Sequence, residues 1–134
     1  MAKILIVDDD THINQMLTEA LRQEGYAVQS AYSGTEALLC LQTAQPDLIL
    51  LDVQMPDMDG FETMRELRRL RNGASVPVVF LSAADHEDTE RTGMQLGAED
   101  FIRKPFLPEL LVHRVRRITE LSAFRRSMCG GTNG

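Results

Sequence analysis

Acidic residues follow two short apolar runs in this 134-residue sequence. Three consecutive aspartates, residues 8–10, come directly after the run at 4–7, and Asp52 comes directly after the run at 48–51. A cluster of carboxylate oxygens suits a hard divalent cation such as Mg²⁺, which would also offset the repulsion among the acidic groups. If the two runs end side by side, this pattern predicts a metal site.

A hydroxyl group and an ammonium group follow two later apolar runs. Ser82 follows the run at 76–81, and Lys104 follows the short run at 99–103. An ionised Asp52 could attack phosphorus as a nucleophile. A bound cation, Lys104 and Ser82 could then stabilise the charge on the phosphoryl oxygens during transfer. These residue types together predict phosphoryl transfer onto Asp52.

Each of these residues also has an ordinary structural interpretation. We interpret Asp10 as the N-cap of the following helix rather than as a metal ligand. One aspartate at the end of a strand is usually a turn residue, and one lysine is usually a solvated surface charge. The chemical interpretation therefore depends on the combination, because unrelated turn residues need not all end adjacent strands.

Five strand-like runs alternate with helix-period segments along the chain. The strands are predicted at residues 4–7, 26–30, 48–51, 76–81 and 99–103. Helices are predicted at about 13–25, 33–41, 60–70, 85–96 and 108–124. The alternation predicts an α/β fold, a flavodoxin-like (βα)5 doubly wound parallel sheet with strand order 2-1-3-4-5. In that order the first and third strands are neighbours, and their carboxyl ends form the expected binding site.

Composition narrows the class of protein. The 43% apolar content suits one packed domain, expected at residues 1–124, with 125–134 as a flexible tail or linker stub. Twenty acidic against 14 basic residues give a net charge of −6, which argues against direct nucleic-acid binding. The apolar run at 4–7 is too short for a secretory signal, and no run approaches the roughly 18 to 20 residues of a membrane span. We therefore expect a cytoplasmic protein that does not bind membranes.

Four segments, taken in order, resemble the receiver domain of two-component response regulators. They are ILIVDDD at 4–10, LDVQMPDMDG at 51–60, LSA at 81–83 and KPF at 104–106. The resemblance extends from residue 3 to about residue 120, and the aspartate-to-glycine segment is its most specific part. It implies a domain that takes a phosphoryl group from the phosphohistidine of a histidine kinase or phosphotransfer protein. Such a domain is not an enzyme in the usual sense, because it catalyses only its own phosphorylation and dephosphorylation.

The resemblance assigns roles to the acidic residues. Asp52 is the phosphoacceptor. Asp9 binds Mg²⁺ directly and Asp8 assists through water. Asp52 and the backbone carbonyl of Gln54 complete the protein ligands of the ion.

It also assigns roles around the pocket. Ser82 is the switch hydroxyl, and Lys104 pairs with the phosphoryl group, with Lys104–Pro105 as a cis peptide bond. Phe101 holds an aromatic switch position, and its ring is expected to pass from exposed to buried on phosphorylation. The readout surface would then be helix 4, strand 5 and helix 5, which would contact an effector domain or a second copy of the chain.

Further positions bear on kinase docking and on signal lifetime. The kinase is expected to contact the start of the first helix and the loop after the last strand, through Ile13, Met16, Pro105 and Phe106. Whether Ile13 and Phe106 are core residues instead stays open. Gln54 and Ala84 flank the expected path of water toward the phosphoryl group. Neither is a general base, so we expect moderate hydrolysis limited by the placement of water, and a longer lifetime for Ala84→Tyr.

Two alternatives remain. A haloacid-dehalogenase-like phosphohydrolase also uses a strand-end aspartate with Mg²⁺. Its motif resembles Asp-x-Asp-x-Thr/Val, but His12 stands at the Thr/Val position counted from Asp8, and Gln54 cannot act as the required general acid counted from Asp52. The chain also lacks room for a substrate cap. A degenerate receiver that acts only as a binding module is the other alternative, although the acidic residues and Lys104 are all present.

Overall fold

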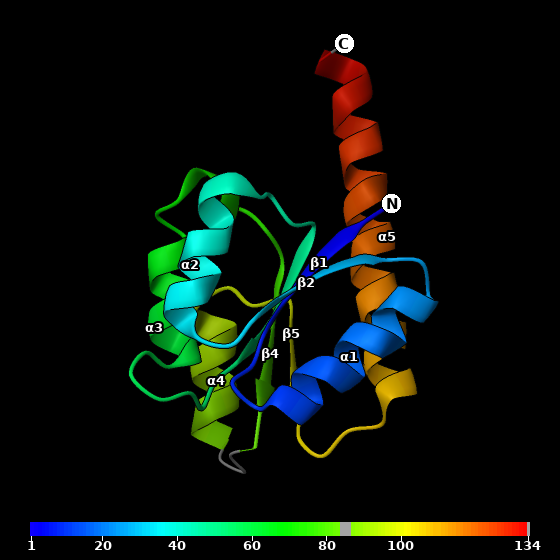
Figure 1. The fold of residues 1–134 in the computed structure, drawn as a ribbon. Helices are drawn as coiled ribbons and strands as arrows, with labels where there is room; N and C mark the ends of the chain where they lie inside the picture. Colours follow the sequence, from blue (N-terminus) through cyan, green and yellow to red (C-terminus); the bar gives the residue numbers. More distant parts are fainter. Residues whose placement is uncertain (84–86, 134) are drawn as a thin grey trace.

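A computed structural model describes residues 1–83 and 87–133 of the chain, and its centre is one parallel sheet (Figure 1). The strands lie in the order β2-β1-β3-β4-β5, which confirms the predicted doubly wound fold. Their bounds are β1 Lys3–Val7, β2 Ala27–Ala31, β3 Leu48–Asp52, β4 Val78–Ser82 and β5 Asp100–Arg103. The crossover helices are α1 Thr11–Gln23, α2 Gly34–Thr43, α3 Gly60–Leu67 and α4 Glu87–Gln95, and α5 Pro108–Asn133 follows the last strand.

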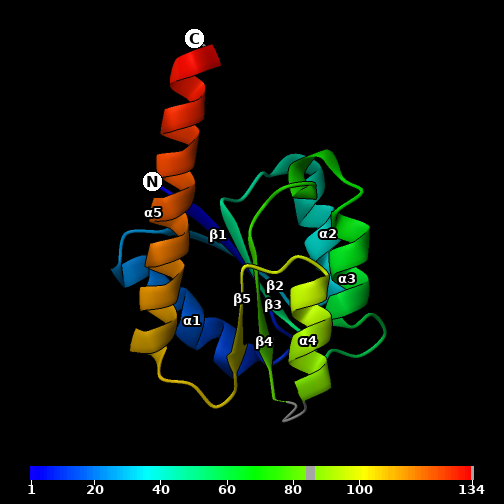
Figure 2. The same cartoon turned by 180° about the vertical axis from the view of Figure 1, so that it is seen from behind.

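The helices cover both faces of the sheet. Figures 1 and 2 show α2, α3 and α4 on one side and α1 and α5 on the other. Alternate residues of each central strand supply the two cores, because successive side chains of a strand point to opposite faces. In β3, Ile49 and Leu51 pack in the core under α2 and α3, whereas Leu48 and Leu50 pack in the core under α1 and α5. The sheet is therefore buried on both faces, as its continuous apolar runs predict.

Short polar contacts fix where the first helix begins and ends. The Asp10 carboxylate accepts hydrogen bonds from the backbone N–H groups of His12 and Ile13, at 3.0 and 3.2 Å. Asp10 is thus the N-cap of α1, as predicted. Gly25 follows the helix with φ of +93°, a conformation that glycine adopts without steric cost.

Two predicted helix ends were wrong. α3 ends at Leu67 rather than at residue 70, and the chain then forms a 3₁₀ turn at Arg71–Gly73. The Arg68 guanidinium closes this turn by donating to the carbonyls of Gly73 and Val76, at 2.8 and 2.7 Å.

α5 continues to Asn133, where a flexible tail from residue 125 was expected. No proline or glycine interrupts the sequence between 109 and 129, so nothing in it stops the helix near 124.

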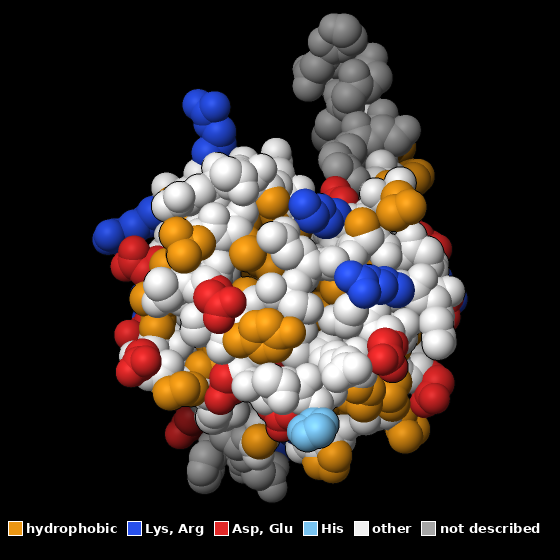
Figure 3. All heavy atoms as spheres, in the orientation of Figure 1, with side chains coloured by type: hydrophobic (Ala, Val, Ile, Leu, Met, Phe, Trp, Pro, Cys, Tyr) orange, Lys and Arg blue, Asp and Glu red, His pale blue; other side chains and the backbone are white. Residues whose placement is uncertain are grey.

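One face of the molecule is mixed in character. On the face drawn in Figure 3, acidic, basic and apolar side chains are interspersed rather than gathered into one basic patch. Among the described helices, none has both the length and the apolar composition needed to cross a bilayer.

Candidate functional site

The acidic pocket lies where β1 and β3 end side by side. Val7 pairs with Leu51 in the parallel register, which places Asp8 beside Asp52 at the carboxyl edge of the sheet. One carboxylate oxygen from each of Asp8, Asp9 and Asp52 lies within 4.8 Å of the others. Asp8 and Asp52 are buried, whereas Asp9 is exposed. The structure thus brings together the three carboxylates that the sequence predicts as metal ligands.

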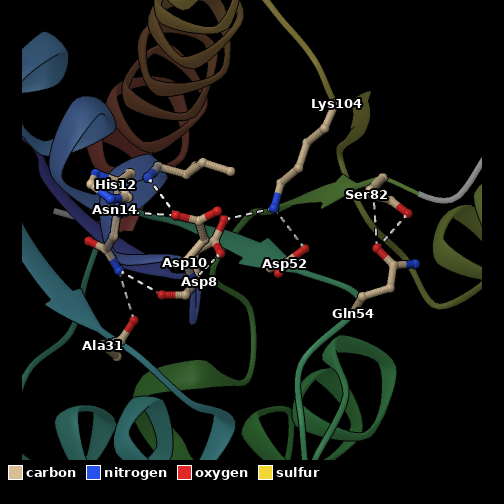
Figure 4. Close-up of polar contacts among 11 residues, drawn as sticks. Asp8, Asp10, His12, Asn14, Ala31, Asp52, Gln54, Ser82 and Lys104 are labelled. Carbon is tan, nitrogen blue, oxygen red and sulfur yellow. Dashed lines mark hydrogen bonds and ion pairs between the residues drawn. The ribbon is translucent and has the colours of Figure 1, made fainter.

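Lys104 reaches this cluster from the end of β5. Its Nζ lies 3.0 Å from Asp8 Oδ2 and 3.2 Å from Asp52 Oδ1 (Figure 4). The Lys104 backbone N–H donates to the Ser82 carbonyl at 2.8 Å, so the end of β5 is tied to the end of β4. The Lys104–Pro105 bond is cis, as the resemblance to receiver domains implies. One ammonium group therefore faces two buried carboxylates.

The electrostatics of the pocket favour a bound cation. The pKa of Asp52 is raised from 3.8 to about 7, mainly by burial and then by the Asp8 charge, while Lys104 opposes the rise. Burial alone would lower the pKa of Lys104, but contacts with Asp8 and Asp52 outweigh it and raise that pKa. Lys104 is therefore an ammonium group, and one positive charge does not balance three carboxylates.

The donor set fits Mg²⁺. Asp52 Oδ1 is buried without a hydrogen bond, since the Lys104 ammonium near it is an ion-pair partner whose geometry is not that of a hydrogen bond. Lys104 is shared between Asp8 and Asp52, so the buried carboxylates keep negative charge that a second cation would compensate. Asp8, Asp9 and Asp52 would hold the ion through oxygen atoms only, as Mg²⁺ prefers. Gln54 is on the loop two residues after Asp52, and the ligand role of its backbone carbonyl stays a prediction.

The fixed position of Asp8 depends on a residue that the sequence analysis missed. Asn14 is fully buried on α1, and its Nδ2 donates to the carbonyls of Asp8 and Ala31, at 3.1 and 3.0 Å. Asp8 Oδ1 also accepts from the Asp10 N–H at 2.9 Å. The sequence could have pointed to this residue, because an asparagine between Ile13 and Leu17 lies on the apolar side of an amphipathic helix, where a polar side chain needs hydrogen-bond partners. Asn14 holds the turn after β1 and so orients the Asp8 carboxylate.

Ser82 lies at the end of β4, beside the end of β3. Asp52 lies opposite Leu81 in the parallel register, and Ser82 is the next residue of β4 after Leu81. The side chain of Ser82 is buried, and its Oγ donates to Gln54 Oε1 at 3.1 Å (Figure 4). The Ala83 N–H donates to the same oxygen at 3.1 Å. No sequence pattern indicated that the Gln54 side chain makes these contacts.

The Phe101 ring is buried in this structure, and its passage from exposed to buried on phosphorylation stays a prediction. Only 6% of the residue is exposed, and its ring lies 6.5 Å from that of Phe80, measured between centroids. Both rings pack against Gly93 of α4, where an added Cβ would lie 3.0 Å from Phe80 and 3.2 Å from Phe101. The missing side chain of Gly93 provides the space that the ring occupies.

The predicted docking residues lie at the same end of the molecule but differ in exposure. Met16 and Pro105 are exposed, whereas Ile13 and Phe106 are half-buried and pack on the core under α1 and α5. Leu107, which the sequence analysis did not single out, is 68% exposed. Ala84, predicted to flank the path of water, lies outside the described residues.

Comparisons with known proteins agree with this architecture. A family model described as "Response regulator receiver domain" matches residues 4–116. Regulatory protein VanRc of Enterococcus gallinarum is 38% identical over 92% of this chain and 52% of its own length. The transcriptional regulatory protein CpxR homolog of Haemophilus influenzae is 40% identical, again over 92% of this chain and 52% of that protein. The solved structure of chemotaxis protein CheY4 from Vibrio cholerae has a TM-score of 0.83 and 37% identity, covering 88% of this chain and 98% of that one.

The fold and the pocket define a doubly wound α/β protein with its acidic site at the topological switch point. This chain belongs to the response regulator receiver domain family of two-component systems. Membership favours the receiver over the phosphohydrolase that the sequence alone left open. The chain spans about half the length of the two regulatory relatives above.

Proposed function

We propose that Asp52 accepts a phosphoryl group from the phosphohistidine of a histidine kinase or phosphotransfer protein, and that Mg²⁺ is required. The main support is the position of Asp52, which is buried within 3.2 Å of the Lys104 ammonium and clustered with Asp8 and Asp9. It also occupies the acceptor position of the family motif. The proposed ligands of the ion are Asp8, Asp9, Asp52 and the Gln54 carbonyl.

The transfer makes one bond and breaks one. An Asp52 carboxylate oxygen bonds to phosphorus while the phosphorus–nitrogen bond breaks, and the imidazole nitrogen of the kinase keeps the bonding electron pair. When bound, Mg²⁺ supplies positive charge to the carboxylates and to the phosphoryl oxygens. Lys104 adds a fixed positive charge, and Ser82 Oγ–H and the Ala83 N–H are donors at the adjacent strand end. The chain's catalytic role is thus confined to its own phosphorylation and dephosphorylation.

Intact-mass measurement tests this proposal. The protein is treated with a phosphorylated histidine kinase or with acetyl phosphate, with Mg²⁺ or with a chelator. Wild type should gain one phosphoryl group only with Mg²⁺, and Asp52→Asn should gain none. Equal labelling of the two proteins would contradict the assignment, whereas no labelling of wild type by either donor would favour a receiver that only binds partners.

We also propose that the kinase docks beside the pocket, at the start of α1 and the loop after β5. Met16 and Leu107 are exposed apolar side chains and are the positions chosen for substitution. Pro105 is not substituted, because it adjoins Lys104 and its replacement would disturb the pocket. Met16→Glu and Leu107→Glu should slow transfer from the kinase but leave labelling by acetyl phosphate unchanged. Leu39→Glu is the matched control, since Leu39 is 58% exposed on α2. A loss of both rates in the test variants would contradict the docking site.

The output surface is proposed to be α4, β5 and α5, where an effector region or a second copy of the chain would bind. On this face Arg114 forms an ion pair with Asp100 at 2.9 Å, and Arg103 forms one with Glu90 at 3.3 Å. Because Phe101 packs between β4 and Gly93 of α4, a change at the end of β4 can reach this face. The location is proposed to be cytoplasmic, where histidine kinases use ATP, and no direct contact of this domain with nucleic acid is proposed.

A further inference from the structure

One side chain of the pocket accepts two hydrogen bonds on a single oxygen. Gln54 Oε1 lies 3.1 Å from Ser82 Oγ and 3.1 Å from the Ala83 backbone nitrogen. A backbone N–H can only donate, so the Gln54 atom that it contacts is the amide oxygen and not the amide nitrogen. The contact joins the loop after β3 to the end of β4, across 28 residues of sequence.

These two donors are the ones that a phosphoryl group on Asp52 would need. Ser82 is the last residue of β4, the strand that pairs with β3, and Ala83 follows it, in the register that sets Leu81 opposite Asp52. A phosphoryl group has three strong acceptor oxygens, and donors already aimed at developing charge stabilise it most. In the present structure both donors are directed at an uncharged amide oxygen instead.

We infer that the Gln54 side chain stands in for a phosphoryl oxygen and holds Ser82 and Ala83 until Asp52 is phosphorylated. This inference rests on the proposed function of Asp52. Phosphorylation then requires the amide to release both donors, while the Gln54 backbone keeps its place on the loop. Gln54 is thereby a positioning residue, which sets how readily the pocket holds a phosphoryl group.

The expected effect is modest, because Gln54 is exposed. Water hydrates the amide again when it releases the two donors. Each of the two hydrogen bonds therefore contributes only a small net free energy to holding the donors on Gln54. Removing the amide oxygen should therefore strengthen binding of a phosphoryl mimic by about three- to tenfold. If the Gln54 side chain only filled space, removing its amide oxygen would not change the affinity for the mimic. If Gln54 instead preorganised the two donors for the phosphoryl group, removing the oxygen would weaken binding.

The test compares wild type with Gln54→Met, which has similar length but no strong acceptor at this position. Gln23→Met is the matched control, since Gln23 is an exposed residue at the far end of α1. The first readout is the backbone amide signal of Ala83, measured by NMR without metal or phosphoryl mimic. In wild type and in the control this proton should show a hydrogen-bonded shift and slow exchange, and both should be lost in Gln54→Met.

The second readout is the affinity for beryllofluoride, a phosphoryl mimic, in the presence of Mg²⁺. It should bind three- to tenfold more tightly to Gln54→Met than to wild type, and the Ala83 signals of the two complexes should become alike. An unchanged Ala83 signal in the free variant, or equal or weaker beryllofluoride binding, would overturn the inference. Failure of beryllofluoride to bind wild type would instead overturn the proposed role of Asp52, whatever the Ala83 signals show.

Discussion

At the scale of single residues, Asp52 lies in an environment that favours its neutral form when no cation is bound. Its pKa is raised from 3.8 to about 7, first by burial and then by the Asp8 charge. The folded chain therefore binds this proton more tightly than the unfolded chain does. It follows that the stability of metal-free protein should fall as the pH rises from about 4 to about 7, and that the loss should be complete above that window.

Asp52→Asn isolates this effect, because asparagine resembles the neutral carboxyl group. In the presence of a chelator, the variant should be more stable than wild type by roughly 2 to 4 kcal/mol at pH 8. The difference should shrink as the pH falls and be small near pH 4. Urea unfolding of the two proteins across this range measures it. A difference that does not vary with pH would show that Asp52 is not the titrating group.

At the scale of elements, the approach of α3 to the end of β3 fixes the acceptor loop. Gly60 begins α3 and donates its N–H to the Val53 carbonyl at 2.8 Å. A Cβ at this position would overlap the Asp52 carbonyl oxygen, which is backbone and cannot rotate away. The glycine is therefore required by the close contact between helix and strand.

Gly60→Ala should lower the free energy of unfolding by about 2 to 3 kcal/mol, the cost of forcing an atom into a filled space. It should also slow phosphorylation by acetyl phosphate, because the backbone of Asp52 must shift. Glu66→Ala on the exposed side of α3 is the control and should change stability by less than about 0.5 kcal/mol. Denaturant unfolding and intact-mass kinetics measure the two effects. A Gly60→Ala protein as stable and as reactive as the control would contradict this account of the loop.

Most elements could be predicted from the sequence, because apolar runs and helix-period spacing mark the strands and the core side of each helix. The pocket carboxylates and Lys104 could be predicted too, since each lies at the end of a strand or within two residues after it. The contact of Gln54 with Ser82 could not, because it joins side chains far apart in sequence and depends on their rotamers. The packing of Phe101 against α4 could not be predicted for a related reason, since it depends on the space left by Gly93 on another element.

At the scale of the whole molecule, a bound cation should couple the pocket to global stability. The carboxylates come from the turn after β1 and from the end of β3, and Lys104 directly follows β5, so the site joins segments that separate on unfolding. A ligand that binds only the folded chain stabilises it by about 2.7 kcal/mol at 100 times its Kd. Mg²⁺ should therefore raise the Tm of wild type by several degrees at pH 8.

The matched variant is Asp9→Asn, which removes an exposed ligand without placing a new group in the core. Its Tm should rise much less at the same Mg²⁺ concentration, while its metal-free stability stays close to that of wild type. Calorimetry with Mg²⁺ and with a chelator gives both values. An equal Mg²⁺ effect on the two proteins would place the ion elsewhere.

The measurement that tests the central claim most directly is chemical trapping of the phosphorylated residue. Borohydride reduces an aspartyl phosphate to homoserine, and peptide mass mapping then locates the changed residue. After treatment with the phosphorylated kinase or acetyl phosphate, homoserine should be found at position 52 only, and only when Mg²⁺ is present. Homoserine at Asp8 or Asp9, or equal trapping with a chelator, would contradict the assignment of Asp52 as a metal-dependent phosphoacceptor.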